Sequence, residues 1–328
     1  MRDDIQEFKE QIVKLGTFLL TRVAVASALC VALNACGKSE PSYSSISTMA
    51  LNYMPYNLAG FTITDQFGHE VSSGGDNEPG GGGGVSCCYA LKGTQFKVSW
   101  NYYDANQWHA GDEKTFHAET TVTLPDSPEP TRIGDRILAV HFYPDRHVEL
   151  EFPASIMPNS RLPVVDVVRA MQQKHGDALD HRYDDTEGDA DRRIARAVAQ
   201  AWIKYRLTDE RDLEQYAYFA LLINPDFDAH PAVQKIIQAD KAKPGALAAS
   251  LQGLQPAVLK ALKNKQFAKV PVPAIPDGLV PPRARRINMR ANCCTVHDSN
   301  SHSLSAATVE DDMNGPLPPP CEESNDAG

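Results

Sequence analysis

Strict alternation of polar and apolar side chains runs through Gln95-Phe-Lys-Val-Ser-Trp-Asn-Tyr102. Because successive side chains of a β-strand point to opposite faces, this pattern predicts a strand with one buried face. Turn residues at Asp65–Gly68 and Tyr143–Arg146 separate further strand-like runs, and the second turn predicts a hairpin. Those runs are Phe61–Thr64, Val85–Cys88, Thr115–Leu124, Ile137–Phe142 and His147–Phe152. Residues 48–158 are therefore predicted to form a small antiparallel β-sheet or sandwich.

The pattern changes after Arg161, where apolar residues recur at the spacing of an α-helix. Thr208 is expected to be the N-cap of one helix, because Asp209 and Glu210 then lie in the first turn, where the helix dipole favours anions. One predicted helical face carries Ile194, Val198, Ala201, Trp202 and Tyr205. Residues 161–267 are predicted to be helical, so the fold class is α+β: a β-domain followed by a helical segment.

Both ends of the chain are predicted to lie outside the folded part. Residues 36–47 are polar and rich in serine, which is typical of a tether. Residues 268–328 are rich in Pro, Ser, Asn and Asp and lack hydrophobic periodicity. We expect them to form a mostly disordered tail, with rapid hydrogen exchange through most of Ala291–Gly328.

The first 35 residues have the features of a secretory signal. Thirteen uncharged residues, Val23–Ala35, follow Arg22; a helix that spans a bilayer needs roughly 20, whereas the apolar core of a signal peptide has about 7–15. The run ends in Leu33-Asn-Ala-Cys36, which resembles the lipobox of bacterial lipoproteins. The resemblance implies cleavage before Cys36, acylation of its thiol and, with Gly37 next, an outer-membrane anchor facing the periplasm. A single anchoring helix and a cleaved signal without lipid are the alternatives.

Composition limits the partners of the chain. The formal net charge is −10, with 42% hydrophobic and 8% aromatic residues, as in an ordinary globular protein. An acidic surface argues against nucleic acid, because a basic patch supplies most of the affinity of nucleic-acid-binding proteins. A basic protein partner is compatible with this charge.

Five of the seven cysteines remain once Cys30 is removed with the signal and Cys36 is acylated. A periplasmic location allows disulfides, but an odd number leaves one thiol unpaired within a monomer. The adjacent pairs lack the CxxC spacing of zinc and redox motifs. We interpret Cys87 and Cys88 as buried thiols at a strand start, with a structural disulfide as the alternative. The remaining three are Cys293, Cys294 and Cys321.

The sequence contains no recognisable catalytic set. The glycines at residues 80–84 lack the Lys and Ser/Thr of a phosphate-binding loop and are interpreted as a mobile loop. His141 and His147 lie on the two arms of the predicted hairpin but have no third metal ligand. The acidic residues between Asp184 and Asp191 lack the EF-hand spacing and are read as a solvated loop. We therefore predict no enzymatic activity, no catalytic residue, no metal and no cofactor.

The β-rich segment resembles a known family. Its quoted motifs are Tyr53-Met-Pro-Tyr-Asn57, Gly84-Val-Ser-Cys-Cys88, Phe96-Lys-Val-Ser-Trp100 and His141-Phe-Tyr-Pro-Asp145. They resemble a domain-of-unknown-function family of proteobacterial lipoproteins found beside type VI secretion phospholipase effectors. A helical stretch, Trp202–Ile237, is similar to a small module at the ends of several type VI-associated proteins. The resemblance implies a periplasmic immunity protein that binds and neutralises a secreted lipase.

An inhibitor of this kind needs only a complementary surface. We expect the β-domain loops Asp76–Ser86 and Tyr102–Gly111 to provide it, because exposed aromatic residues are typical binding hot spots. Asp104 and Asp112 are expected to steer a basic partner. The candidate partner-binding aromatics are Tyr102, Tyr103 and Trp108. The alternative is an envelope lipoprotein with a structural or enzymatic role and no toxin partner.

Overall fold

The structure, a computed structural model, describes residues 40–109, 111–125, 136–153, 160–183 and 190–281. These residues belong to one unit of the chain, Met1–Ala284. The second unit, Arg285–Gly328, lies outside the described residues, as do the predicted signal, Cys36, and the acidic loop between helices α3 and α4.

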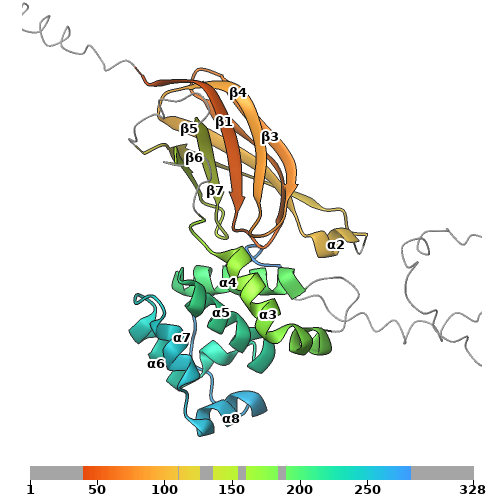
Figure 1. Ribbon diagram of the computed structural model, residues 1–328, viewed down its shortest axis with the longest axis vertical. Coiled ribbons are helices and arrows are strands. Elements are labelled where there is room, and N and C mark those ends of the chain that lie inside the picture. The colour runs from red at the N-terminus through yellow and green to blue at the C-terminus, as the bar shows by residue number, and fades with distance from the viewer. Residues whose placement is uncertain (1–39, 110, 126–135, 154–159, 184–189, 282–328) are drawn as a thin grey trace, which may run out of the picture. The chain divides into compact units, whose positions relative to one another are not determined.

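Two four-stranded sheets form the first part of the fold (Figure 1). The first has the order β4-β1-β7-β8, in which β1 and β7 run parallel and the other pairs antiparallel. The second has the order β3-β2-β5-β6 and is antiparallel throughout. The strands are β1 (Ser42–Asn52), β2 (Asn57–Asp65), β3 (Glu70–Asn77), β4 (Gly82–Lys92), β5 (Gln95–Tyr103), β6 (Thr115–Thr123), β7 (Ile137–Phe142) and β8 (Val148–Glu151).

The two sheets pack face to face as a sandwich. Phe142 of β7 contacts Phe61 of β2 and Trp100 of β5, with ring centroids 5.3 and 5.6 Å apart. The inward residues of β5 alternate with outward ones, as the sequence pattern predicted. The turn at Asp65 and the hairpin between β7 and β8 also lie where they were predicted.

The structure corrects the predicted tether. Strand β1 begins at Ser42, so the segment 36–47 extends six positions too far, to Ser47. The serine-rich sequence resembles a linker and contains few of the β-branched and aromatic residues that indicate a strand. Tyr43 and Ile46 are nevertheless buried between polar neighbours. Strand β1 also has an irregular register with β4, so a strict period of two is absent.

The prediction of a mobile loop at residues 80–84 is wrong for most of its length, because Gly82–Gly84 belong to strand β4. Strand β3 reaches Asn77 and β4 starts at Gly82, so only residues 78–81 connect them. Gly80 adopts a φ of +80°, and a Cβ placed on it would lie 2.9 Å from the Cβ of Val164. Its N–H donates to the carbonyl of Asn52 over 2.7 Å. Glycine is required here because the backbone turns left-handed against a helix.

Helices form the second part, and the predicted α+β class is confirmed. Their bounds are α2 (Ala105–His109), α3 (Val164–Arg182), α4 (Ala190–Tyr205), α5 (Glu210–Tyr218), the π-helix η2 (Phe219–Ile223), the 3-10 helix η3 (Phe227–Ala229), α6 (Pro231–Asp240), α7 (Ala246–Gln252) and α8 (Pro256–Asn264). The N-cap of α5 is Asp209, not Thr208: its carboxylate accepts from the backbone N–H groups of Arg211 and Asp212. This placement satisfies two donors that a helix start leaves open.

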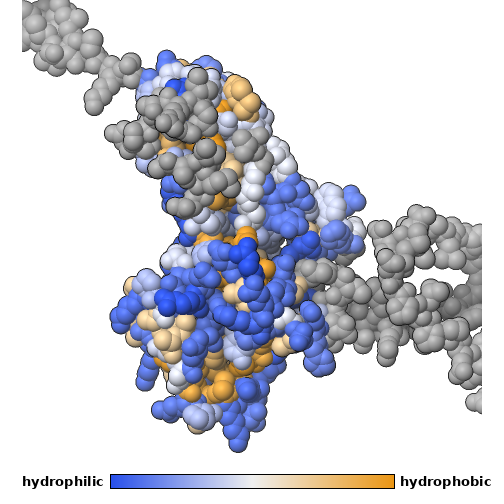
Figure 2. Space-filling model, viewed as in Figure 1, coloured by the Kyte–Doolittle hydropathy of each residue, from blue (hydrophilic) through white to orange (hydrophobic). Residues whose placement is uncertain are grey.

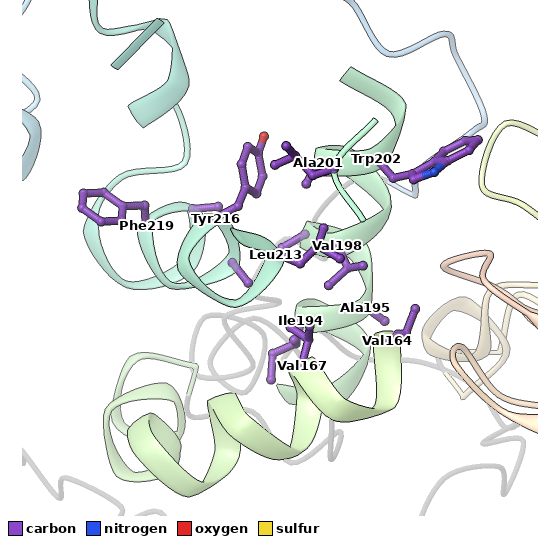
Figure 3. Close-up of a cluster of buried hydrophobic side chains, with 14 of the residues drawn as sticks. Val164, Val167, Ile194, Ala195, Val198, Ala201, Trp202, Leu213, Tyr216 and Phe219 are labelled. Carbon is purple, nitrogen blue, oxygen red and sulfur yellow. The ribbon is translucent and has the colours of Figure 1, made fainter. Parts of the chain in front are cut away.

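The helical core includes one face of a sheet. Side chains of α3, α4 and α5 point toward one another (Figure 3). Phe219 of η2, Leu51 of β1 and Ala139 of β7 belong to the same cluster. Within the same cluster, Trp202 extends away from the other labelled side chains (Figure 3) and stacks on Tyr143 of the hairpin, with ring centroids 5.2 Å apart. The sheet β4-β1-β7-β8 is therefore buried on both faces near its centre.

Residues 268–281 do not behave as the predicted tail. The N–H of Val270 donates to the carbonyl of Ala229 over 2.8 Å, and Leu279 is buried. The carbonyl of Gly278 accepts from the hydroxyl of Tyr56 and from the guanidinium of Arg146, at 3.0 and 2.8 Å. This stretch binds along the surface of the fold as far as Pro281, and the rest of the predicted tail lies outside the described residues.

Candidate functional site: an aromatic pair at the end of strand β5

Strand β5 ends in Tyr103, and the short helix α2 follows after one residue. The helix carries Trp108 back to Tyr103, with ring centroids 5.0 Å apart at 51°. Trp108 is 38% exposed and is one of three exposed large hydrophobic residues in the described part of the chain. Figure 2 shows a hydrophilic surface around α2, so the two rings lie in polar surroundings.

Hydrogen bonds fix the orientation of Tyr103. Its hydroxyl donates to Asp76 Oδ2 over 2.6 Å, and Asn57 Nδ2 donates to Asp76 Oδ1 over 2.9 Å. Partial burial, with the bond to Asp76 next in effect, raises the pKa of Tyr103 to about 12. The phenol therefore remains a donor at neutral pH. We call Tyr103, Trp108 and Asp76, with the buried Asn57 that supports them, the Tyr103–Trp108 surface.

A buried ion pair anchors the start of helix α2 to helix α4. Asp104 is 4% exposed, and its Oδ1 lies 2.9 Å from Nη2 of Arg196 in α4. Arg192, also in α4, donates a hydrogen bond to Asn106 Oδ1 over 2.9 Å. Asp104 is therefore unable to steer a partner, which corrects the sequence prediction, whereas Asp112 is exposed. Arg196 lies outside the apolar face of α4 that the sequence predicted, so no local pattern indicated this contact.

Tyr102 does not belong to the surface. It is 3% exposed and stacks on Phe116 of β6, with ring centroids 5.4 Å apart. Trp100 and Tyr102 lie two positions apart, so both point into the sandwich. The prediction that Tyr102 binds a partner is wrong for this reason, while Tyr103 points outward.

Cys87 and Cys88 are not buried. Both thiols are free and exposed on β4, and their Sγ atoms lie 2.7 Å apart. The expectation of small buried residues at a strand start is therefore wrong. Cys36 and the pair Cys293–Cys294 lie outside the described residues.

The two hairpin histidines have separate carboxylate partners. His141 Nε2 lies 3.1 Å from Glu151 Oε1, and His147 Nδ1 lies 2.5 Å from Asp145 Oδ1. His141 is fully buried, and burial lowers its pKa to about 4, so the imidazole is neutral at pH 7. In the described part of the chain, no cluster of three or more His, Cys, Asp or Glu side chains is placed to hold a metal ion.

The comparisons with known proteins concern the sandwich alone. Residues 51–150 match a family described as a protein of unknown function, DUF3304. The match starts near the end of β1 and stops within β8, so it covers none of the helices α3 to α8. It supports the expectation that the β-rich segment belongs to a family of unknown function. No curated protein and no solved structure matches the chain.

None of the helices within the described ranges is both long and apolar enough to cross a bilayer.

Proposed function

We propose that the chain is a periplasmic lipoprotein that binds and neutralises a type VI secretion lipase effector, as an immunity protein. The Tyr103–Trp108 surface carries the contact, and Cys36 carries the lipid anchor. The observation that supports this binding site most directly is the 38% exposed indole of Trp108, packed against an oriented Tyr103. The resemblance of the β-rich segment to lipase-associated lipoproteins supplies the class of partner.

The physical properties of this surface suit protein binding. Tyr103 and Trp108 are rigid aromatic side chains, which lose little conformational entropy on binding and are enriched among hot spots. The bonds from Asn57 and Tyr103 to Asp76, and the ion pair of Asp104 beneath α2, hold the pair in place before a partner arrives. Such preorganisation increases affinity because less ordering is needed at binding.

Co-expression with the cognate type VI lipase effector that the proposal requires, directed to the periplasm, tests this proposal. We expect the wild type to restore growth, and Trp108→Ala and Tyr103→Ala each to lose protection. Truncation of a hot-spot residue costs about 2 kcal/mol or more, which weakens Kd roughly thirtyfold. Binding of the purified pair, measured by calorimetry, should show the same order of loss.

Phe67→Ala is the matched control. Phe67 is also an exposed aromatic residue, at 48%, but it lies in the turn after β2, at the opposite end of that strand from Asn57. Circular dichroism should show that all three variants keep the fold. Equal protection by Trp108→Ala and the wild type would overturn the assignment of the surface, and no protection by the wild type would overturn the immunity function.

The lipid anchor is tested separately. Cys36→Ser removes the thiol that acylation requires, and we expect the protein to move from the membrane pellet to the soluble periplasmic fraction. Unchanged pelleting would contradict the anchor. It would favour a single anchoring helix, without bearing on the binding surface.

The alternative function is an envelope lipoprotein with a structural or enzymatic role. One group of side chains supports an enzymatic role. The Tyr53 hydroxyl lies 2.9 Å from Nδ1 of His141, and Nε2 of His141 contacts Glu151. A hydroxyl, an imidazole and a carboxylate in series are the components of acyl-transfer sites. Tyr53 is only 2% exposed, however, so a substrate has no access to its oxygen in this conformation.

A further inference from the structure

Cys87 and Cys88 are neighbours within strand β4. In a regular strand, adjacent side chains point to opposite faces of the sheet, so adjacent thiols lie far apart. Here the two Sγ atoms lie 2.7 Å apart, and both side chains are exposed. The backbone must therefore depart from a regular strand between them.

A β-bulge provides this departure. Strand β1 advances two positions from Ile46 to Thr48, while their partners on β4, Tyr89 and Ser86, are three positions apart. One extra residue is therefore inserted in β4 at the cysteines, and Cys88 adopts a φ of +74°. A bulge redirects side chains in this way and is a recurrent feature near functional sites.

The residue type at the bulge is itself informative. A left-handed conformation is unfavourable for a residue with a Cβ, and glycine or asparagine is the usual occupant. A cysteine at position 88 is therefore strained, but this conformation places its thiol on the same face of the strand as the thiol of Cys87. Outliers of this kind gather at functional sites.

We propose that Cys87 and Cys88 are a redox-active vicinal dithiol, which closes to a disulfide within β4 by thiol–disulfide exchange. This inference does not depend on the proposed immunity function. The oxidant is a small or protein disulfide of the oxidising compartment that the N-terminal signal implies.

The exchange balances with glutathione disulfide as the oxidant. The thiolate of one cysteine attacks a sulfur of glutathione disulfide, forms a mixed disulfide and releases one glutathione thiolate. The second cysteine thiolate attacks the protein sulfur of that mixed disulfide and releases the second glutathione. Each thiol proton passes through solvent to a departing thiolate, so the pair loses two electrons and the oxidant gains two.

The pair should react more slowly at neutral than at alkaline pH. The hydrogen bond with Cys87 raises the pKa of Cys88, so less of this thiol is ionised at neutral pH. The thiolate is the reacting species in both exchange steps. This dependence separates the pair from a low-pKa redox cysteine.

The test uses the full chain, purified in reductant and then equilibrated in buffers of reduced and oxidised glutathione. Peptide mapping by mass spectrometry after alkylation should find the peptide with Cys87 and Cys88 lighter by two hydrogens and unalkylated. Cys87→Ser and Cys88→Ser should each instead carry one glutathione. Phenylarsine oxide, which needs two neighbouring thiols, should bind the reduced wild type once at this peptide and neither variant.

The pair Cys293–Cys294 controls for adjacency in sequence alone. A disulfide that joins Cys87 or Cys88 to another cysteine would overturn the proposal. Full alkylation of both thiols at every glutathione ratio would also overturn it. Circular dichroism of the two serine variants shows whether the strand is intact, and the arsenical result gives a second readout that does not require oxidation.

Discussion

At the scale of single residues, the contacts of His141 are consistent with one protonation state. The N–H of Arg161 donates to the Tyr53 oxygen over 2.9 Å, and the Tyr53 hydroxyl donates to His141 Nδ1 over 2.9 Å. The Nε2–H of His141 then donates to Glu151, 3.1 Å away. Each group has a suitable partner when the imidazole is neutral, in agreement with a pKa lowered to about 4 by burial.

This burial predicts how stability depends on pH. Between the ordinary pKa of 6.5 and the folded value of about 4, the unfolded chain binds a proton that the folded protein excludes. The contribution of His141 is therefore complete above 6.5 and is lost as the pH falls toward 4, by roughly 3 kcal/mol in total. Urea unfolding at pH 7.5 to 4 should show a steeper loss for the wild type than for His141→Gln. Parallel curves would contradict the prediction.

The site residues were predictable to different degrees. Alternation along β5 was sufficient to place Tyr102 beside Trp100 in the core and Tyr103 outside, so the error there lay in treating the aromatics as one group. The burial of Asp104 was not predictable locally, because its partner Arg196 lies 92 positions further along the chain. The bulge at Cys88 depends likewise on pairing with β1.

At the scale of elements, strand β1 is an interior strand of its sheet that the sequence analysis did not predict. It pairs with β4 on one side and with β7 on the other, in parallel, with Ser47 opposite Ile137. Parallel partners are joined by long connections, so neither strand indicates the other in the local sequence. The hydrophobic run of β7 was easy to recognise, whereas the serines of β1 resembled a linker.

A truncation series measures the contribution of this strand. A chain that begins at Thr48 lacks the fully buried Ile46 and the buried Tyr43, whereas one that begins at Glu40 keeps them. Burial of these two side chains contributes on the order of 4 kcal/mol, which corresponds to about 10 °C in melting temperature. Thermal unfolding followed by circular dichroism should show this difference. Similar melting temperatures would mean that residues 42–47 act as the tether first predicted.

At the scale of the whole molecule, the division into β and helical parts was predictable, but their shared core was not. Leu51, Tyr53, Ala139 and Tyr143 of the sandwich belong to the hydrophobic cluster of the helices. The sequence held one sign of this: the run Ile137–Phe142 has no alternation, and every residue in it is buried. A continuous apolar run is typical of a strand that is covered on both faces.

The shared core predicts that the sandwich depends on the helices, although the family match covers the sandwich alone. A fragment of residues 40–153 would expose Leu51, Tyr53, Ala139 and Tyr143, which the helices cover in the full chain. Each larger side chain would lose about 1.5–3 kcal/mol of burial. We expect the fragment to keep strand-type circular dichroism, to melt well below the full chain and to bind a hydrophobic fluorescent dye. A chain of residues 40–281 is the control, because it retains the contacts of Gly278 with Tyr56 and Arg146 and should melt as the full chain does. A fragment that melts at the temperature of the control without binding dye would show that the sandwich is an independent domain.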